Sequence, residues 1–510
     1  MSNRFDFGGV NLRAGEESSG ARPTSETPFC VAVLGDFSGR PNRGVFEPKT
    51  VGERYPHLVD RDNFDEVLSK LHPELHLPTE SGAPLVFRFS QLDDFHPDHL
   101  YENEAFQRLK ELRERLQDPS TFKEIAEQLG VLRPVPAATP VQENVRVTAP
   151  NPGRLASGSL LDEMIEQTES RIAVAPPRRT DEVHEFARQL AAKYAVSAPD
   201  ARQPEVIASV DRAIGDAMRA ILHHPHFQAL EAIWRATFML VRQLETGPQL
   251  KIYLIDISKQ ELAADLKAPD DLRNSGTFRL LVEKTVETLG ADPFTIMVGA
   301  FRFGSVAEDM ELLPKLATMA HRAGAALLAE ADPLLLGCGS LEETPSPRDW
   351  KRSELQSLWN QVRSLPESAS IGLALPRLLL RLPYGKETSP LDSFNFEEFS
   401  GLPTHKEYLW GNPAFFVALM AGQSFEEDGW RMQPGSQSQI ENLPLHAFRV
   451  DGELQSKPCA EVLLTEDAVE CITDRGLIPL VSYKGRDSVR VGRFQSVAQP
   501  QRPLRGRWES

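Results

Sequence analysis

A proline-rich stretch between residues 131 and 159 divides this chain of 510 residues into a shorter and a longer part. Five prolines fall within these 29 residues, and no apolar residue recurs there at the spacing of a helix or a strand. Proline lacks a backbone N–H and fixes its own φ angle, so such a stretch cannot continue a helix or an inner strand. We therefore predict a linker, or an extended arm that becomes ordered only against a partner, between two folded parts.

The shorter part, residues 25–130, alternates segments that are typical of strands and helices, which predicts a small α/β domain. Residues 1–24 before it are polar and are expected to lack order. The elements expected in this part are a buried strand at Phe29–Phe37, a short helix capped by Asp62 or Asn63, a half-buried strand at Leu85–Phe89 and one helix from Pro97 to Leu116.

The longer part begins with short amphipathic helices at 160–205 and continues as a second α/β domain at 206–500, with a tail at 501–510. Apolar runs of strand length alternate with helical segments, as in a sheet that is covered on both faces. The elements expected are helices at 207–221, 227–241 and 413–425, and strands at 250–257, 294–300, 325–328, 371–376, 462–464 and 478–483. The predicted fold is therefore two mixed α/β domains joined by a proline-rich arm, with a β-rich C-terminal portion.

The charge and the cysteines exclude several classes of protein. The chain carries 73 Asp and Glu against 56 Lys and Arg, a net charge of −17 that opposes binding to the phosphates of nucleic acid. No apolar stretch is long enough for a signal peptide or a membrane span, so we expect a cytoplasmic protein. The four cysteines form no C-x-x-C pair, which predicts reduced, mostly buried thiols instead of a zinc ribbon or disulfides.

The turn at Leu34–Arg40 carries two glycines directly after a predicted strand, an arrangement that can cradle a phosphate. It lacks Gly-Lys-Ser/Thr and G-x-G-x-x-G, and Pro41 blocks an immediate helix, so a turn or packing loop is the favoured interpretation. Ser38 could instead be a hydrolase nucleophile, with the cluster Asp93–His99 supplying a base and an orienting group. A hydrolase is the most distant alternative.

The clusters Asp93–His99 and His223–His226 contain residue types that bind metal ions. Both lie beside proline at predicted helix boundaries, where Asp and His cap helix ends, and neither places two histidines along one helix face. Capping is the favoured role for both clusters. We predict no catalytic residue, no metal and no cofactor.

Segments of the longer part closely resemble the large subunit of the contractile sheath of type VI secretion systems, in order and spacing, over roughly residues 160–500. These segments are His224–Arg235, Leu375–Gly385, Phe394–Glu398, Tyr408–Asn412 and Leu443–His446. Segments of the shorter part resemble the small sheath subunit over roughly residues 25–130. They are Pro28–Gly39, Asp60–Val67, Asp94–Pro97 and Leu109–Leu116. The chain therefore looks like both subunits fused.

The resemblance implies a structural protein of the bacterial cytoplasm without catalytic residues. In that family the two subunits form one protomer of a helical tube around an inner tube, and contraction drives the inner tube into a target cell. The implied partners are other sheath subunits, the inner-tube protein, the baseplate and a Clp-type recycling ATPase, with no nucleic acid and no membrane insertion. Family protomers add extended segments to neighbouring sheets, which implies such a role for the proline-rich arm.

Two sets of residues follow from the resemblance. A short helix resembles the one that the recycling ATPase grasps, and the alternative is a helix that docks on the chain's own domain. Its residues are Leu160, Leu161, Asp162, Glu163, Met164 and Ile165, of which the two leucines, Met164 and Ile165 form one apolar face. The motif residues that are expected to pack or to form interfaces are Gly35, Asp36, Phe64, Phe227, Trp234, Arg235, Arg377, Arg381, Tyr384, Tyr408, Trp410 and Asn412.

The sequence also departs from the family. The family's large subunit continues well beyond the segment that matches Phe494–Pro500, so we expect a large subunit that is shortened at its C-terminus. The usual Pro-Thr-Glu stretch is replaced at Pro458–Glu461, and Ala-Thr follows Trp234-Arg235 in place of Gly-Leu. These differences keep a second interpretation open, a sheath-like accessory that does not propagate, such as a sheath terminator or a baseplate adaptor.

Overall fold

The computed structural model describes residues 5–7, 10–12, 23–78, 84–128, 200, 202–351 and 354–508. The proline-rich arm at 131–159 and the predicted ATPase-binding segment Leu160–Ile165 lie outside the described residues. The chain divides into two compact units. One combines Met1–Gln107 with Ile214–Ser510, and the other is Arg108–Ala213.

One sheet of nine strands forms the centre of the larger unit, in the order β13-β17-β16-β10-β9-β8-β3-β7-β4. Its parallel strands are β3 (Phe29–Gly35), β7 (Leu250–Asp256), β8 (Ile296–Phe303), β9 (Ala326–Ala331), β10 (Ile371–Leu375) and β16 (Ile478–Ser482). Its antiparallel strands are the edge strand β4 (His57–Val59) at one end, and β17 (Val489–Val491) followed by the edge strand β13 (Gln439–Ile440) at the other. The predicted mixed α/β class is confirmed.

The prediction of two separate sheet domains does not hold, because β3 lies inside the sheet of the longer part. All seven residues of β3 pair with β7, from Phe29 with Leu250 to Gly35 with Asp256, and β8 pairs with its other edge. A parallel strand that is buried on both faces needs a neighbour at each edge to satisfy its backbone. The apolar run at Phe29–Leu34 indicated such a strand, but its pattern contains no information about which strands would flank it.

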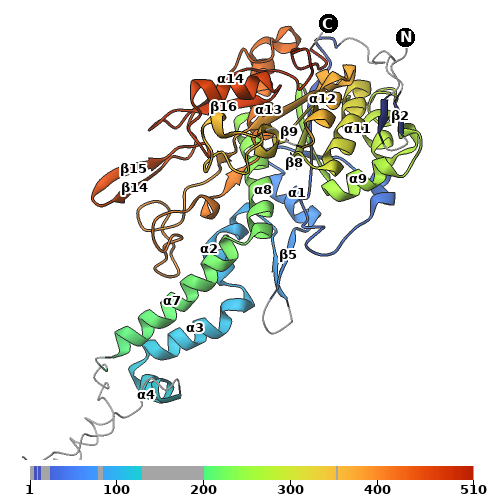
Figure 1. The fold of residues 1–510 in the computed structure, drawn as a ribbon. Coiled ribbons are helices and arrows are strands. Elements are labelled where there is room, and N and C mark those ends of the chain that lie inside the picture. The colour runs from blue at the N-terminus through green and yellow to red at the C-terminus, as the bar shows by residue number, and fades with distance from the viewer. Residues whose placement is uncertain are drawn as a thin grey trace, which may run out of the picture. The chain divides into compact units, whose positions relative to one another are not determined.

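Helices cover both faces of this sheet, as Figure 1 shows around the labelled strands. On one face, Cys30, Ala32 and Leu34 of β3 belong to a core cluster with residues of α9 (Lys259–Lys267) and α11 (Ala307–Ala323). On the other face, Phe29 stacks on Phe425 of α13 (Pro413–Asp428), with ring centroids 4.8 Å apart. Gly35 lies on this second face against Ile233 of α8 (Pro225–Gln243). The sheet is therefore the middle of three layers.

The remaining elements of the larger unit are shorter. The helices are α1 (Phe64–Leu71), α2 (Pro97–Tyr101), α10 (Gly276–Phe278), α12 (Gln356–Ser364) and α14 (Glu466–Asp474). Four pairs of strands form separate ribbons: β1 (Phe5–Phe7) with β2 (Val10–Leu12), β5 (Glu74–Leu77) with β6 (Leu85–Arg88), β11 (Leu378–Leu379) with β12 (Trp410–Gly411), and β14 (His446–Val450) with β15 (Glu453–Lys457).

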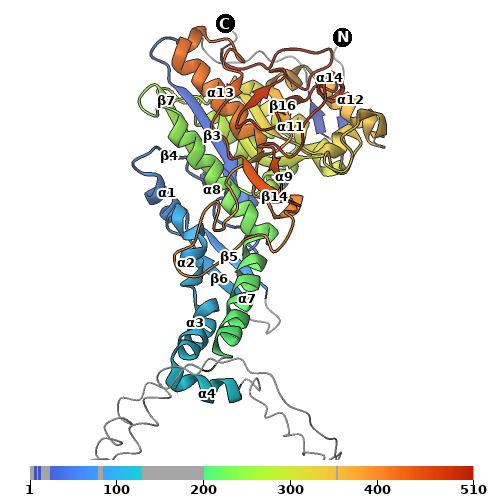
Figure 2. The same ribbon diagram turned by 90° about the vertical axis from the view of Figure 1, so that its left-hand side faces the viewer.

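The smaller unit is helical. Its described elements are α4 (Pro119–Gln128) and most of α3 (Glu104–Gln117), together with the first half of α7 (Gln203–Leu222). Helices α3 and α7 run side by side (Figure 2), joined by an ion pair of 2.6 Å between Arg113 Nε and Asp211 Oδ1. The side-chain amide of Gln203 also donates to the backbone oxygen of Leu116.

Three predicted elements differ from the structure. The single helix from Pro97 to Leu116 is two helices, because Asn103 interrupts it and its side chain accepts from the N–H of Ala105 at the start of α3. Residues 462–464 form no strand and instead pack Val462 and Leu464 against the core. Strands β1 and β2 lie within the start that was expected to lack order, where F-D-F and V-N-L alternate apolar and polar residues.

The predictions for the cysteines and the membrane can also be compared with the structure. All four cysteines are free thiols, three of them buried and Cys471 partly buried, as expected. Among the residues that the structure describes, no helix combines the length and the apolar character needed to cross a bilayer.

We predict that Gly35→Ala destabilises the protein, because β3 approaches its neighbours too closely for a side chain. An added Cβ would lie 2.8 Å from Ala300 Cβ and 2.4 Å from Ile233 Cδ1. The expected loss is about 1–3 kcal/mol in the free energy of unfolding. Gly401→Ala is the matched control because open space surrounds Gly401, and it should change that free energy by less than about 0.5 kcal/mol. Equal thermal unfolding midpoints for the two variants would contradict this packing.

Candidate functional site

The twelve motif residues are buried or partly buried, and none is fully exposed. The buried ones are Gly35, Phe64, Phe227, Trp234, Tyr384, Tyr408 and Trp410. The partly buried ones are Asp36, Arg235, Arg377, Arg381 and Asn412. Most of them therefore act within the chain, through contacts that join segments far apart in the sequence.

Trp234 on α8 joins the longer part of the chain to the shorter part. Its side chain has no exposed surface, and its indole Nε1 donates to the backbone oxygen of Phe37 at 2.9 Å. The rings of Phe37 and Phe64 lie edge-on to the indole, with centroids 5.1 and 5.8 Å away. Phe227, two turns earlier on the same face of α8, packs edge-on against Phe89 and Phe95.

Arg381 lies at the centre of a buried ion-pair network that brings three motif segments together. Its Nε donates to Glu231 Oε1 of α8 at 2.8 Å, and its Nη1 donates to Glu398 Oε2 at 2.8 Å. Arg235 donates to the same Glu231 oxygen at 2.6 Å and to the hydroxyl of Tyr384 at 3.0 Å. Glu231 and Glu398 are almost completely buried, so each carboxylate depends on these guanidinium groups for charge compensation.

The electrostatics of this network favour the fully ionised state. Burial alone would raise the pKa of Glu398, but Arg381, His223 and the backbone N–H of Tyr384 outweigh it and lower that pKa to about 2. Burial would likewise lower the pKa of Arg381, but its two carboxylate partners hold it well above the ordinary value. Burial raises the pKa of Tyr384 to about 12, so its hydroxyl remains a neutral partner for Arg235.

Arg377 centres a second network, at the ends of β9 and β10. Its Nε donates to Glu461 Oε1 at 2.8 Å, and its backbone N–H donates to Glu461 Oε2 at 2.9 Å. The backbone N–H of Glu461 donates in turn to the backbone oxygen of Arg377 at 3.0 Å. His405 contacts the same carboxylate at 3.1 Å. Glu330 of β9 lies 4.0 Å from Arg377 and 3.3 Å from Arg302, and burial raises its pKa to about 7.

An aromatic cluster adjoins the second network. The Tyr408 hydroxyl and His446 Nδ1 are 2.8 Å apart, and Trp410 Nε1 donates to the backbone oxygen of His405 at 2.9 Å. The ammonium group of Lys457 lies 5.7 Å from the ring centroids of both Tyr408 and Trp410. These contacts anchor one end of the β14–β15 ribbon to the cluster.

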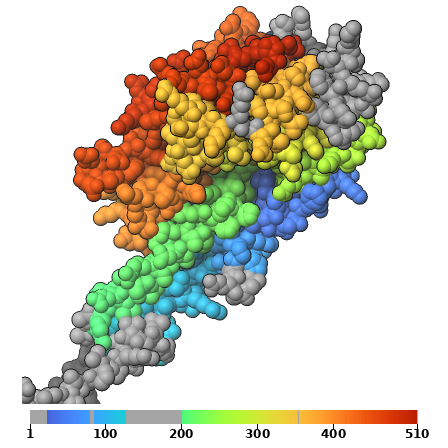
Figure 3. Space-filling model, in the orientation of Figure 1, coloured from blue at the N-terminus to red at the C-terminus, as the bar shows by residue number. Residues whose placement is uncertain are grey.

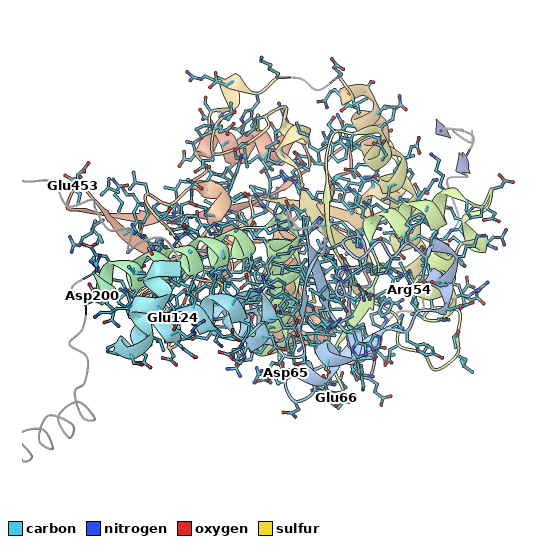
Figure 4. The ribbon with its side chains drawn as sticks, turned by 90° about the horizontal axis from the view of Figure 1, so that it is seen from below. Arg54, Asp65, Glu66, Glu124, Asp200 and Glu453 are labelled. Carbon is cyan, nitrogen blue, oxygen red and sulfur yellow. The ribbon has the colours of Figure 1, made fainter. Side chains whose placement is uncertain are left out.

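A third network joins the shorter and longer parts through the buried carboxylate of Glu261 on α9. Arg40 Nη2 and Arg54 Nη2 each donate to Glu261 Oε1 at 2.8 Å. Figure 4 labels Arg54, which follows the short 3-10 helix at Pro48–Glu53. Asp36 accepts from the N–H of Arg40, and burial raises its pKa to about 6.

Asn412 has two roles at the start of α13. Its Oδ1 accepts from the N–H of Ala414, which caps the helix. Its Nδ2 lies 3.4 Å from the backbone oxygen of Gly299 and 3.3 Å from that of Phe301, where a bulge interrupts the pairing of β8 with β9. Asn412 therefore connects the start of α13 to the backbone at this bulge.

The alternative sites on Ser38 and the histidine clusters gain no support from the geometry. Ser38 Oγ donates to Asp256 Oδ2 at 2.7 Å and accepts from Arg43, and no residue of the cluster Asp93–His99 is hydrogen-bonded to it in the described part of the chain. The residues with defined positions contain no group of three or more side chains suited to holding a metal ion.

The expected capping role of the histidines is confirmed. His96 Nδ1 accepts from the N–H of Asp98 at the start of α2, and His224 Nδ1 accepts from the N–H of His226 at the start of α8.

Sequence reasoning missed the acidic partners of the predicted arginines, namely Glu231, Glu398, Glu461 and Glu261. A signal was present for Glu231, which precedes Arg235 by four residues on the apolar face that Phe227 and Trp234 also share. The other three come from distant segments and could not be matched to their arginines by spacing. Together the networks fix the relative positions of the segments. Their charged side chains are already paired with one another inside the chain.

We predict that Glu398→Gln lowers the free energy of unfolding at neutral pH by about 3 kcal/mol, because Arg381 loses a buried counter-charge. The pKa of Glu398 lies below its ordinary value, so its stabilising effect is present above about pH 4.5 and is lost as the pH falls towards about 2. The stability gap between wild type and variant should therefore shrink in that window, measured by urea unfolding at a series of pH values.

Glu397→Gln is the control for this experiment, because the neighbouring Glu397 is exposed and forms no ion pair with any residue that the structure describes. It should stay within about 0.5 kcal/mol of wild type at neutral pH. A gap for Glu398→Gln that keeps its size throughout the acid range would contradict the ionised network.

Two families match this chain, in the order that the motifs suggested. Residues 204–498 match the family described as "EvpB/VC_A0108, tail sheath N-terminal domain", VipB. Residues 9–128 match the family described as "Type VI secretion system, VipA, VC_A0107 or Hcp2". The hydrogen bond from Trp234 to Phe37 and the ion pairs of Glu261 connect these two matched segments.

A curated relative is the type VI secretion system sheath protein TssC1 of Pseudomonas aeruginosa, which is 32% identical to this chain over 304 residues. The similarity covers 58% of this chain and 61% of the relative, so the chain spans less than two thirds of that protein's length. The match to VipB alone includes more than half of the residues of this chain. The chain therefore belongs to the EvpB/VC_A0108 tail sheath family.

Proposed function

We propose that this chain is a structural protomer of a type VI contractile sheath, in which a small-subunit portion and a large-subunit portion form one polypeptide. The observation that carries this proposal is the position of β3. This strand comes from the segment that matches the small subunit, and it pairs with β7 and β8, which come from the segment that matches the large subunit. The two portions thus share one sheet and behave as one building block.

The buried contacts support a mechanical role for this building block. The Trp234 indole and the Glu261 carboxylate bind groups from the small-subunit portion, and the Arg381 network ties α8 to the segments at 375–385 and 394–398. Buried ion pairs of this kind are costly to separate, because breaking one leaves an uncompensated charge. A protomer that transmits force between neighbours benefits from such internal rigidity, and packing and rearrangement of protomers take the place of catalysis.

The partners belong to the same proposal. They are further sheath subunits, an inner-tube protein, a baseplate and a Clp-type recycling ATPase, the last binding at Leu160–Ile165. The arm at 131–159 would add a strand to the sheet of a neighbouring protomer, and the motif residues hold each protomer in shape. The proposed boundaries are 25–130 for the small-subunit portion and 206–500 for the large-subunit portion, in the cytoplasm of a bacterium.

Electron microscopy of the purified full chain, with and without the inner-tube protein, tests this function. We expect tubes with a cogwheel-like cross-section, because a propagating protomer must contact copies of itself around and along the tube. Discrete particles under both conditions would contradict a propagating sheath subunit. Binding of such particles to the ends of tubes built from a separate small and large subunit would then identify a terminator or adaptor.

A further inference from the structure

The last part of the chain is cationic, in contrast to the rest. Residues 483–508 contain seven Lys and Arg and one Asp, a net charge of +6, although the whole chain carries −17. The other residues therefore carry −23 together. In Figure 3 the red surface includes these residues together with α14, which precedes them in the chain.

Five exposed cations of this part form what we call the basic surface: Lys484, Arg486, Arg490, Arg493 and Arg502. They come from the turn between β16 and β17, from β17 itself and from the segment after it. Arg490 lies between the buried Val489 and Val491, so strand alternation directs its side chain away from the face that these two valines bury.

The fold brings Arg493 and Arg502 of the basic surface close together. Arg493 Nη1 donates to Gln501 Oε1 at 3.2 Å, which places Arg493 beside the residue that precedes Arg502. The acidic groups near this surface include Asp487 in the turn and Asp474, whose Oδ1 lies 3.4 Å from Gln501 Nε2. Glu441 is also close, because its Oε1 accepts from Gln439, the residue that pairs with Arg490. The surface therefore keeps a surplus of positive charge.

The basic surface differs from the arginines inside the molecule. Arg40, Arg377 and Arg381 each bind at least one carboxylate. None of the five cations of the basic surface forms an ion pair with a carboxylate within the described ranges of the chain. Single exposed cations are ordinary, but a cluster without counter-charges on a strongly anionic protein is suited to an anionic partner.

We propose that the basic surface binds the anionic surface of a second copy of this chain. Two copies that each carry −17 repel one another through most orientations, whereas contact through this surface is attractive. Such a contact joins one patch to a different patch on the neighbour, so it can repeat in one direction and build a ring or a filament. The inference rests on the proposed self-assembly and assigns a surface to it.

Sedimentation velocity of the full chain at a series of NaCl concentrations tests this inference, with variants of matched charge. Arg490→Glu with Arg493→Glu reverses two charges on the basic surface. Arg348→Glu with Lys406→Glu makes the same change in net charge at exposed positions elsewhere. We expect the wild-type association constant to fall about tenfold or more between about 0.05 and 0.5 M NaCl. At low salt, the first variant should lose about tenfold or more, and the control should lose about threefold or less.

Equal association of the two variants, or wild-type association that is independent of salt, would overturn the inference. Binding of a short DNA duplex that Arg490→Glu with Arg493→Glu abolishes, while self-association persists, would overturn it in favour of a polyanion site. The experiments distinguish a failure of this inference from a failure of the proposed function. Normal tubes formed by this variant would refute the basic surface alone, whereas salt-dependent pairing without any tubes would refute the sheath role alone.

Discussion

The pairing of β3 with β7 on one edge and with β8 on the other is the interaction on which the rest of the structure depends. All seven residues of β3 are buried. Removing this strand would expose the backbone edges of two inner strands and the apolar layers on both faces of the sheet. Because β3 comes from the small-subunit match and its neighbours from the large-subunit match, the large portion is incomplete without the small one.

The ion-pair networks fix the orientation of the segments that pack around this strand pairing. Burial of apolar surface is not directional, whereas Arg381 must meet two carboxylates at once and Glu261 must meet two guanidinium groups. The Arg381 network fixes α8 against the segments that follow β10, and the Glu261 network fixes the turn after β3 against α9. The motifs that identify the family are therefore reciprocal partners in the interior, which explains why they are widely spaced in the sequence.

Local patterns predicted much of the fold, and long-range partners could not be predicted from them. The apolar periods before and after Pro225 gave α7 and α8, and the run at Phe29–Leu34 gave β3. Neither pattern indicates that β3 enters the sheet of the longer part, because strand order depends on packing between distant segments. In the same way, Arg381 could be singled out by its motif, but its partner Glu398 could not be matched to it by spacing.

Cleavage of the folded chain tests the central claim, that both portions share one sheet, most directly. A protease site introduced between residues 131 and 159 would cut the covalent connection after folding. We expect the two fragments to migrate together in size-exclusion chromatography even at about 0.5 M NaCl, where surface ion pairs are screened, and to separate only in denaturant. Separation in native buffer into two folded fragments would contradict it.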